Sequence, residues 1–163
     1  MLNHFFVLSH FEVLETAMRT FVPFTCDDEI AVIGSGFLDR SLPKSAWTHA
    51  AHFATTLWLI GSRPEIDVAR ELPGMIRAFN EAKGGANTDT SGCHETITQA
   101  SVRAARRFLA ESPPRALFAT CNALMESPLG DPDWLLEYWS RERLFSVEAR
   151  RVWVGPDIRE LPL

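Results

Sequence analysis

The chain has 163 residues and a formal net charge of −5; 46% of its residues are apolar and 23% are charged. These values are typical of one globular domain with its own core, and they exclude disordered, collagen-like and disulfide-scaffold proteins. The acidic balance argues against nucleic acid or an anionic membrane surface as a main partner. We therefore expect a single domain over residues 1–163.

Helix signals recur along the chain and strand signals are sparse, which predicts an all-α bundle of five to seven helices with an irregular C-terminal tail. Apolar spacing, capping residues and prolines set the expected boundaries. The expected helices cover residues 4–21, 26–38, 49–61, 63–82 with a kink or break at Pro73, 94–110, 115–125 and 132–138.

Several of these boundaries carry specific start signals. Thr25 can cap the second helix, with Asp28 as the acid of a weak capping box. Ser45 or Thr48 can cap the third. The run Ser62-Arg63-Pro64-Glu65 combines a cap, a proline in the first turn and an acid at the third position, and it predicts a helix start.

The cysteines and the uncharged third helix bear on the compartment. Cys26, Cys93 and Cys121 form no C-x-x-C pair, which argues against a thiolate zinc site or a disulfide framework and favours a cytoplasmic protein. The N-terminus lacks the basic start and cleavage site of a signal peptide. Residues 45–62 carry no formal charge, but their histidines and threonines are costly in lipid, so we expect a buried helix and no membrane span.

Residues 30–36, IAVIGSG, resemble the start of a dinucleotide-binding turn. That turn needs a third glycine, where this chain has Asp39, and an acid about 20 residues further on. No Asp or Glu occurs between Asp39 and Glu65. We therefore expect Gly34 and Gly36 to allow close helix packing instead.

Histidines form the main candidate site. His49 and His52 are three residues apart on one predicted helix, which places both rings on one face with Cβ atoms roughly 5–6 Å apart. His94 opens another helix, and steps of three and four from it follow an inward stripe through Ile97 and Ser101. Two helices can thus bring three imidazoles to the core.

Three imidazoles and an open position are typical of a divalent metal site, with zinc first and iron or nickel as alternatives. The spacing alone also fits a metal-free polar site or core histidines that only form hydrogen bonds. Glu95 could act as a catalytic base for a metal-bound water, or simply be an acid in the first helical turn. Asn87, in the polar loop before His94, could bind a substrate or only connect two helices, and Trp47 could wall the pocket.

Three segments, WTHAAH at 47–52, NTDTSGCHETIT at 87–98 and YWSRERLFSVEARRVWVGPDIRELPL at 138–163, resemble a family of small, uncharacterised bacterial proteins. Its pattern is W-T-H-x-x-H, then N-T-x-T-x-G-x-H-E-T-I/L-T, then Y-x-S-R-E-R-L-F-S-x-E-A-R. The resemblance covers residues 27–163 and implies a compact helical protein whose signature histidines match His49, His52 and His94. It implies no activity. The chain departs from the pattern at Cys93, where the family has tyrosine, and residues 1–25 form an N-terminal extension.

The sequence thus predicts a metal-dependent enzyme that acts on a small molecule through a metal-bound water. A non-catalytic protein that binds a metal or a small ligand is the first alternative. The second is a helical interaction protein with structural histidines. The expected partner is a small-molecule ligand rather than nucleic acid or membrane, and a homodimer remains open.

Overall fold

The computed structural model describes residues 21–162, so the helix expected over residues 4–21 falls almost entirely outside the described part. Within residues 21–162 the chain forms seven α-helices and three 3₁₀ helices and no strand, which confirms the all-α prediction. The α-helices are α1 (Asp27–Leu38), α2 (His49–Ser62), α3 (Val68–Ala82), α4 (Glu95–Glu111), α5 (Leu117–Glu126), α6 (Arg141–Leu144) and α7 (Val147–Arg151). The 3₁₀ helices are η2 (Lys44–Ala46), η3 (Pro128–Gly130) and η4 (Trp134–Glu137).

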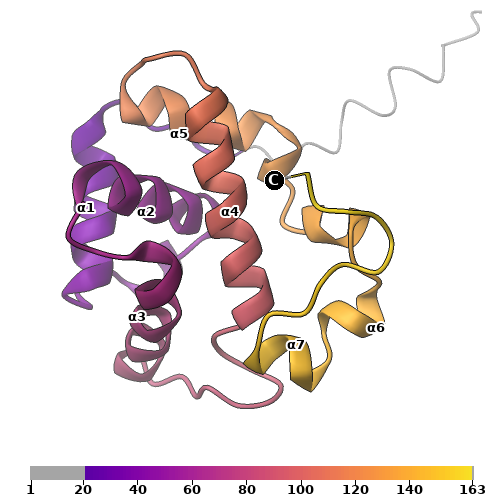
Figure 1. The fold of residues 1–163 in the computed structure, drawn as a ribbon. Helices are drawn as coiled ribbons and strands as arrows, with labels where there is room; N and C mark the ends of the chain where they lie inside the picture. The colour runs from indigo at the N-terminus through magenta and orange to yellow at the C-terminus, as the bar shows by residue number, and fades with distance from the viewer. Residues whose placement is uncertain (1–20, 163) are drawn as a thin grey trace, which may run out of the picture.

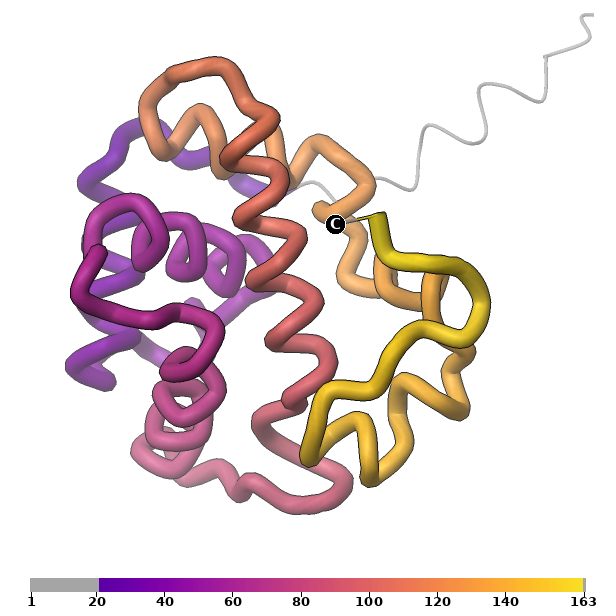
Figure 2. The backbone as a smooth tube through the Cα atoms, in the orientation of Figure 1, coloured from indigo at the N-terminus to yellow at the C-terminus, as the bar shows by residue number. Residues whose placement is uncertain are grey.

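Helix α4 runs through the middle of the molecule. Figure 1 shows α1, α2 and α3 on one side of it and the segment with α6 and α7 on the other. The tube in Figure 2 shows that the C-terminal segment passes beside the first turns of α4. Because α4 packs against α2, α3 and α7, it forms the common wall between the two halves of the core.

Helices α1 and α2 pack closely at a glycine. A Cβ atom on Gly34 would lie 2.2 Å from Cε3 of Trp58, so only hydrogen fits there. The segment IAVIGSG lies wholly inside α1 and forms no strand–turn–helix unit. The expectation that Gly34 allows close helix packing agrees with this contact.

The uncharged helix α2 is the most buried helix of the fold. Its residues Ala51 and 53–59 are buried, which explains why the segment carries no charge. Thr48 is its N-cap, as one of the two predicted caps, and its Oγ1 accepts the backbone N–H of Ala51. No helix within residues 21–162 is long and apolar enough to cross a membrane.

The predicted start of the next helix is wrong by several residues. Helix α3 begins at Val68 with Asp67 as its N-cap, and the run 62–65 ends α2 and turns the chain. The acid of the start signal, Glu65, pairs with the side chain of Arg63 and is therefore not used for capping. Local capping rules could not show that Glu65 would pair with Arg63 instead of capping a helix.

Pro73 does not divide α3, so the break that was predicted there as the alternative to a kink is wrong. It lies in the second turn of a continuous helix, where its missing N–H leaves the carbonyl of Ala69 without an intrahelical donor. Nε2 of Gln99, on α4, donates to that carbonyl at 2.7 Å. A tertiary hydrogen bond therefore compensates for the one that proline removes.

Helices α4 and α5 lie within two residues of their predicted bounds, but the helix predicted over residues 132–138 is replaced by the 3₁₀ turn η4. The tail after α7 is irregular, as expected, and side chains hold it in place. Oγ1 of Thr96 donates to the carbonyl of Val152 and accepts the N–H of Val154. Nε1 of the fully buried Trp139 donates to the carbonyl of Val154.

Candidate functional site

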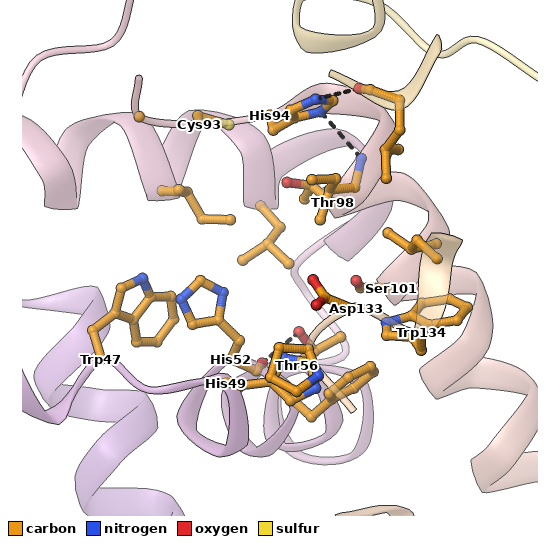
Figure 3. A pocket seen from close by; sticks show the side chains of 18 of the residues that line it. Trp47, His49, His52, Thr56, Cys93, His94, Thr98, Ser101, Asp133 and Trp134 are labelled. Carbon is orange, nitrogen blue, oxygen red and sulfur yellow. Dashed lines mark hydrogen bonds between the residues drawn. The ribbon is translucent and has the colours of Figure 1, made fainter. Parts of the chain in front are cut away.

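A cavity of about 470 Å³ lies between α2 and α4 and is bordered by α3, by the segment around η4 and by the end of α6. Its volume falls within the usual range for small-molecule sites. Figure 3 shows α4 above and the histidines of α2 below. The lining residues are Trp47, His49, His52, Phe53, Thr56, Leu72, Ile76, Asn80, Gly92, Cys93, His94, Ile97, Thr98, Ser101, Pro132, Asp133, Trp134, Leu135, Leu136, Leu144 and Phe145.

Trp47 forms one wall of the cavity, as predicted. Its ring stacks on Phe37 with centroids 4.5 Å apart and an interplanar angle of 9°, and it also contacts Phe79. His52 packs against the indole with a centroid distance of 4.0 Å. The core of the bundle therefore fixes the indole, and the indole supports the imidazole that faces the cavity (Figure 3).

The two histidines of α2 line the cavity together, as their spacing predicts. Nε2 of His49 lies 2.8 Å from the carbonyl oxygen of Leu129, so this nitrogen carries the hydrogen and donates it. The same ring meets Phe53 edge-on. Within residues 21–162, by contrast, the ring of His52 makes no hydrogen bond, so both of its nitrogens are free for a ligand in the cavity.

The side chain of His52 lines the cavity and is solvent-exposed there, and neighbouring protein atoms crowd the ring. Burial among these atoms disfavours the charged form and lowers the pKa of His52 to about 4, and the neighbouring His49 lowers it further. At neutral pH His52 is therefore an uncharged group that can accept one hydrogen bond and donate another.

His94 is buried on the opposite wall, and both of its ring nitrogens are occupied. It is the N-cap of α4, where its Nδ1 accepts the N–H of Ile97 at 3.4 Å. Its Nε2 donates to the carbonyl oxygen of Leu144 at 2.9 Å. Burial lowers the pKa of His94, with a smaller contribution from Arg150. The ring therefore joins the start of α4 to the end of α6 as a neutral imidazole.

The polar loop before His94 is organised by Asn87, which does not line the cavity. Its Nδ2 donates to the carbonyl of Arg77 at 3.1 Å, and its Oδ1 accepts the N–H of Cys93. Gly92 has φ +84°, and a Cβ there would lie 2.6 Å from Oδ1 of Asn87. Asn87 therefore shapes the loop that delivers His94, and a substrate-binding role for it stays a prediction.

Two arginines of α7 bind the same loop. Arg150 donates to the carbonyl oxygens of Gly92 and Cys93, at 3.2 and 3.4 Å. Arg151 forms a two-pronged pair with the carboxylate of Asp89, at 2.9 and 2.8 Å. The motif segments at 87–98 and 138–163 are thus in direct contact, and their polar residues account for much of each other's hydrogen bonding.

Glu95, predicted as the catalytic residue, does not line the cavity. One of its carboxylate oxygens lies 3.4 Å from a guanidinium nitrogen of Arg77, and the other accepts from Nε2 of Gln99 at 2.9 Å. Gln99 in turn satisfies the carbonyl left free by Pro73. In this arrangement Glu95 stabilises the packing of α4 on α3 and forms no hydrogen bond with a histidine.

The three predicted ligands line one cavity, but they do not form a common coordination group. Within residues 21–162 no set of three or more His, Cys, Asp or Glu side chains could hold a metal ion. Because both nitrogens of His94 are engaged with backbone groups, binding a metal there would require breaking one of these bonds. The metal site predicted from the sequence therefore stays a prediction.

Several lining residues were not identified from the sequence as site residues. Ser101 lies on the inward stripe from His94, and that periodicity was a usable signal. Trp134 begins the short 3₁₀ helix η4 and Asp133 precedes it; no recognisable motif marks this segment, so only the tertiary structure brings them to the cavity. Asp133 is the only Asp, Glu, Lys or Arg among the residues that line it.

No protein-family model, curated protein or solved structure matches the chain, so the site rests on its own geometry.

Proposed function

We propose that this protein binds a small molecule in the cavity between α2 and α4. The observation that carries the proposal is His52, a neutral imidazole that faces a cavity of about 470 Å³ with no hydrogen-bond partner among residues 21–162. A polar ring in this position needs a partner, and water or a ligand can supply it. Trp47 holds the ring from behind, so little ordering is needed on binding.

Binding is better supported than hydrolysis assisted by Glu95. That carboxylate is engaged by Arg77 and Gln99 and lies outside the cavity lining. A general base must come within hydrogen-bond reach of the group that it deprotonates. The arrangement therefore supports the alternative of a small-ligand binding protein over the metal-dependent enzyme.

A fragment screen followed by saturation-transfer NMR tests the proposal. We expect ligands whose signals are lost when Ser101→Phe fills the cavity, whereas Ser35→Phe on the exposed surface of α1 leaves them unchanged. His52→Leu removes the free nitrogens while keeping an apolar side chain, and it should weaken binding about tenfold. Binding that persists in folded Ser101→Phe would contradict the proposal.

Elemental analysis of protein purified without a histidine tag tests the metal separately. The proposal expects ligand binding that is unchanged by a chelator. Stoichiometric zinc, iron or nickel that is lost in folded His49→Ala would instead favour the metal site predicted from the sequence.

A further inference from the structure

The charge of the cavity identifies the class of ligand. Among the lining residues Asp133 is the only one with a formal charge, and no Lys or Arg is present. Asp133 is exposed at the opening of the cavity, and within residues 21–162 its carboxylate makes no ion pair or side-chain hydrogen bond. Figure 3 shows it directed toward the space between the walls of α2 and α4. An unpartnered carboxylate at the edge of an apolar cavity attracts cations and repels anions.

The rest of the lining favours an organic cation over a metal ion. Four aromatic rings, those of Trp47, Phe53, Trp134 and Phe145, border the cavity, and the face of an aromatic ring attracts an ammonium group. The hydroxyl of Ser101 adds an acceptor for an ammonium hydrogen. A bare divalent ion would need several more ligands, and within residues 21–162 no cluster of three or more His, Cys, Asp or Glu side chains is placed to hold one.

We propose, as an extension of the binding function above, that the ligand is a small amine with an apolar, aromatic body whose protonated nitrogen pairs with Asp133. The body would pack among the aromatic side chains, while neutral His52 would exchange a hydrogen bond with a polar substituent. Carboxylates and phosphates would be excluded because the cavity offers them no cation.

Matched compounds test the charge preference. Calorimetric titrations would compare 2-phenylethylamine with 2-phenylethanol and 3-phenylpropanoate, and tryptamine with its alcohol and acid analogues. We expect each amine to bind about tenfold more tightly than its alcohol, and the acids to bind most weakly. The difference should shrink at high salt.

Two variants assign the preference to one carboxylate. Asp133→Asn should bring the amine and the alcohol to near-equal affinity, and because the side chain caps no helix the variant should fold normally. Asp133→Glu should keep part of the preference. Glu126→Gln removes an equal charge from an exposed residue outside the cavity and should change nothing.

The possible results separate the two proposals. Alcohols or acids that bind as tightly as the amines, with binding abolished by Ser101→Phe, would overturn the amine assignment and leave the binding function in place. An amine preference that survives in Asp133→Asn would also overturn it. Failure of all of these compounds and of the fragment screen to bind would overturn both.

Discussion

His52 and His94 lie on opposite walls of one cavity, and burial lowers the pKa of both, yet their nitrogens are used differently. His94 has a backbone partner at each nitrogen, whereas His52 has a supporting indole and no hydrogen bond within residues 21–162. On the α4 wall, His94 therefore has a structural role. On the α2 wall, the ring nitrogens of His52 are free for a ligand in the cavity. Lowered pKa values at two histidines therefore do not imply an equal role.

The difference follows from where each residue stands on its helix. His94 is an N-cap, where backbone N–H groups are unpaired and a side-chain acceptor is needed. His52 lies within the first turn of α2, and the cap of that helix is already supplied by Thr48. Its ring is therefore not needed for capping, and it lies against Trp47 and lines the cavity.

Replacing His94 should have the largest effect. His94→Ala leaves the N–H of Ile97 and the carbonyl of Leu144 unpaired and opens a void, so we expect a loss of about 3 kcal/mol in the free energy of unfolding. His52→Ala removes one tilted ring contact with Trp47 and should cost about 1 kcal/mol. Urea denaturation measures both, and equal losses would remove the distinction between the two walls.

The loop that delivers His94 should be nearly as sensitive. Gly92→Ala places a Cβ 2.6 Å from Oδ1 of Asn87 at a φ of +84°, and it should cost about 2 kcal/mol. Gly74→Ala is the matched control, because its Cβ meets no atom within 4 Å and it lies inside α3, where alanine favours the helix. Thermal denaturation should show a lower Tm for Gly92→Ala and a higher Tm for Gly74→Ala. An unchanged Tm in Gly92→Ala would contradict the argument that a side chain at this position is strained.

Lowering the pH should destabilise the folded protein through protonation of His52 on α2. His52 takes up a proton near its ordinary pKa of 6.5 in the unfolded chain but only at about 4 in the folded protein. Between these values the unfolded chain holds more protons, so the contribution of His52 to the free energy of unfolding falls as the pH decreases from 6.5 to 4 and is constant above that window. Because the ring faces the cavity, solvent screening makes the loss smaller than the full pKa difference implies.

The variant His52→Gln should flatten this pH profile in part. His94 acts in the same direction, since its pKa is also lowered, and it should supply the slope that remains. Denaturation midpoints measured from pH 7 to pH 4 provide the comparison. An unchanged slope in His52→Gln would show that the imidazole of His52 is not held neutral by the fold.

The surface pair between the two motif segments should have the smallest effect. Arg151 and Asp89 are both exposed, so Arg151→Ala should cost less than about 1 kcal/mol despite the two-pronged geometry. Glu111→Ala, which breaks the exposed pair with Arg107 inside α4, provides a control of the same kind. A loss well above this range for Arg151→Ala would place the pair among the main supports of the loop.

Much of the helical framework was predictable because its signals act over a few residues. The cap at Thr48, the close packing at Gly34 and the extents of α4 and α5 follow from such local rules. The same rules failed at Ser62 and Pro73, where a side-chain pair and the amide of Gln99 changed the outcome.

For the site, the sequence by itself determined that His49 and His52 share a helix face, because a spacing of three residues brings two side chains together in any α-helix. Only the tertiary structure decided that His94 is bound to the carbonyl of Leu144, that Glu95 turns to Arg77, and that Asp133 supplies the charge of the cavity. These partners are far apart in the chain, and which of them meet depends on how the helices pack, which no local pattern encodes.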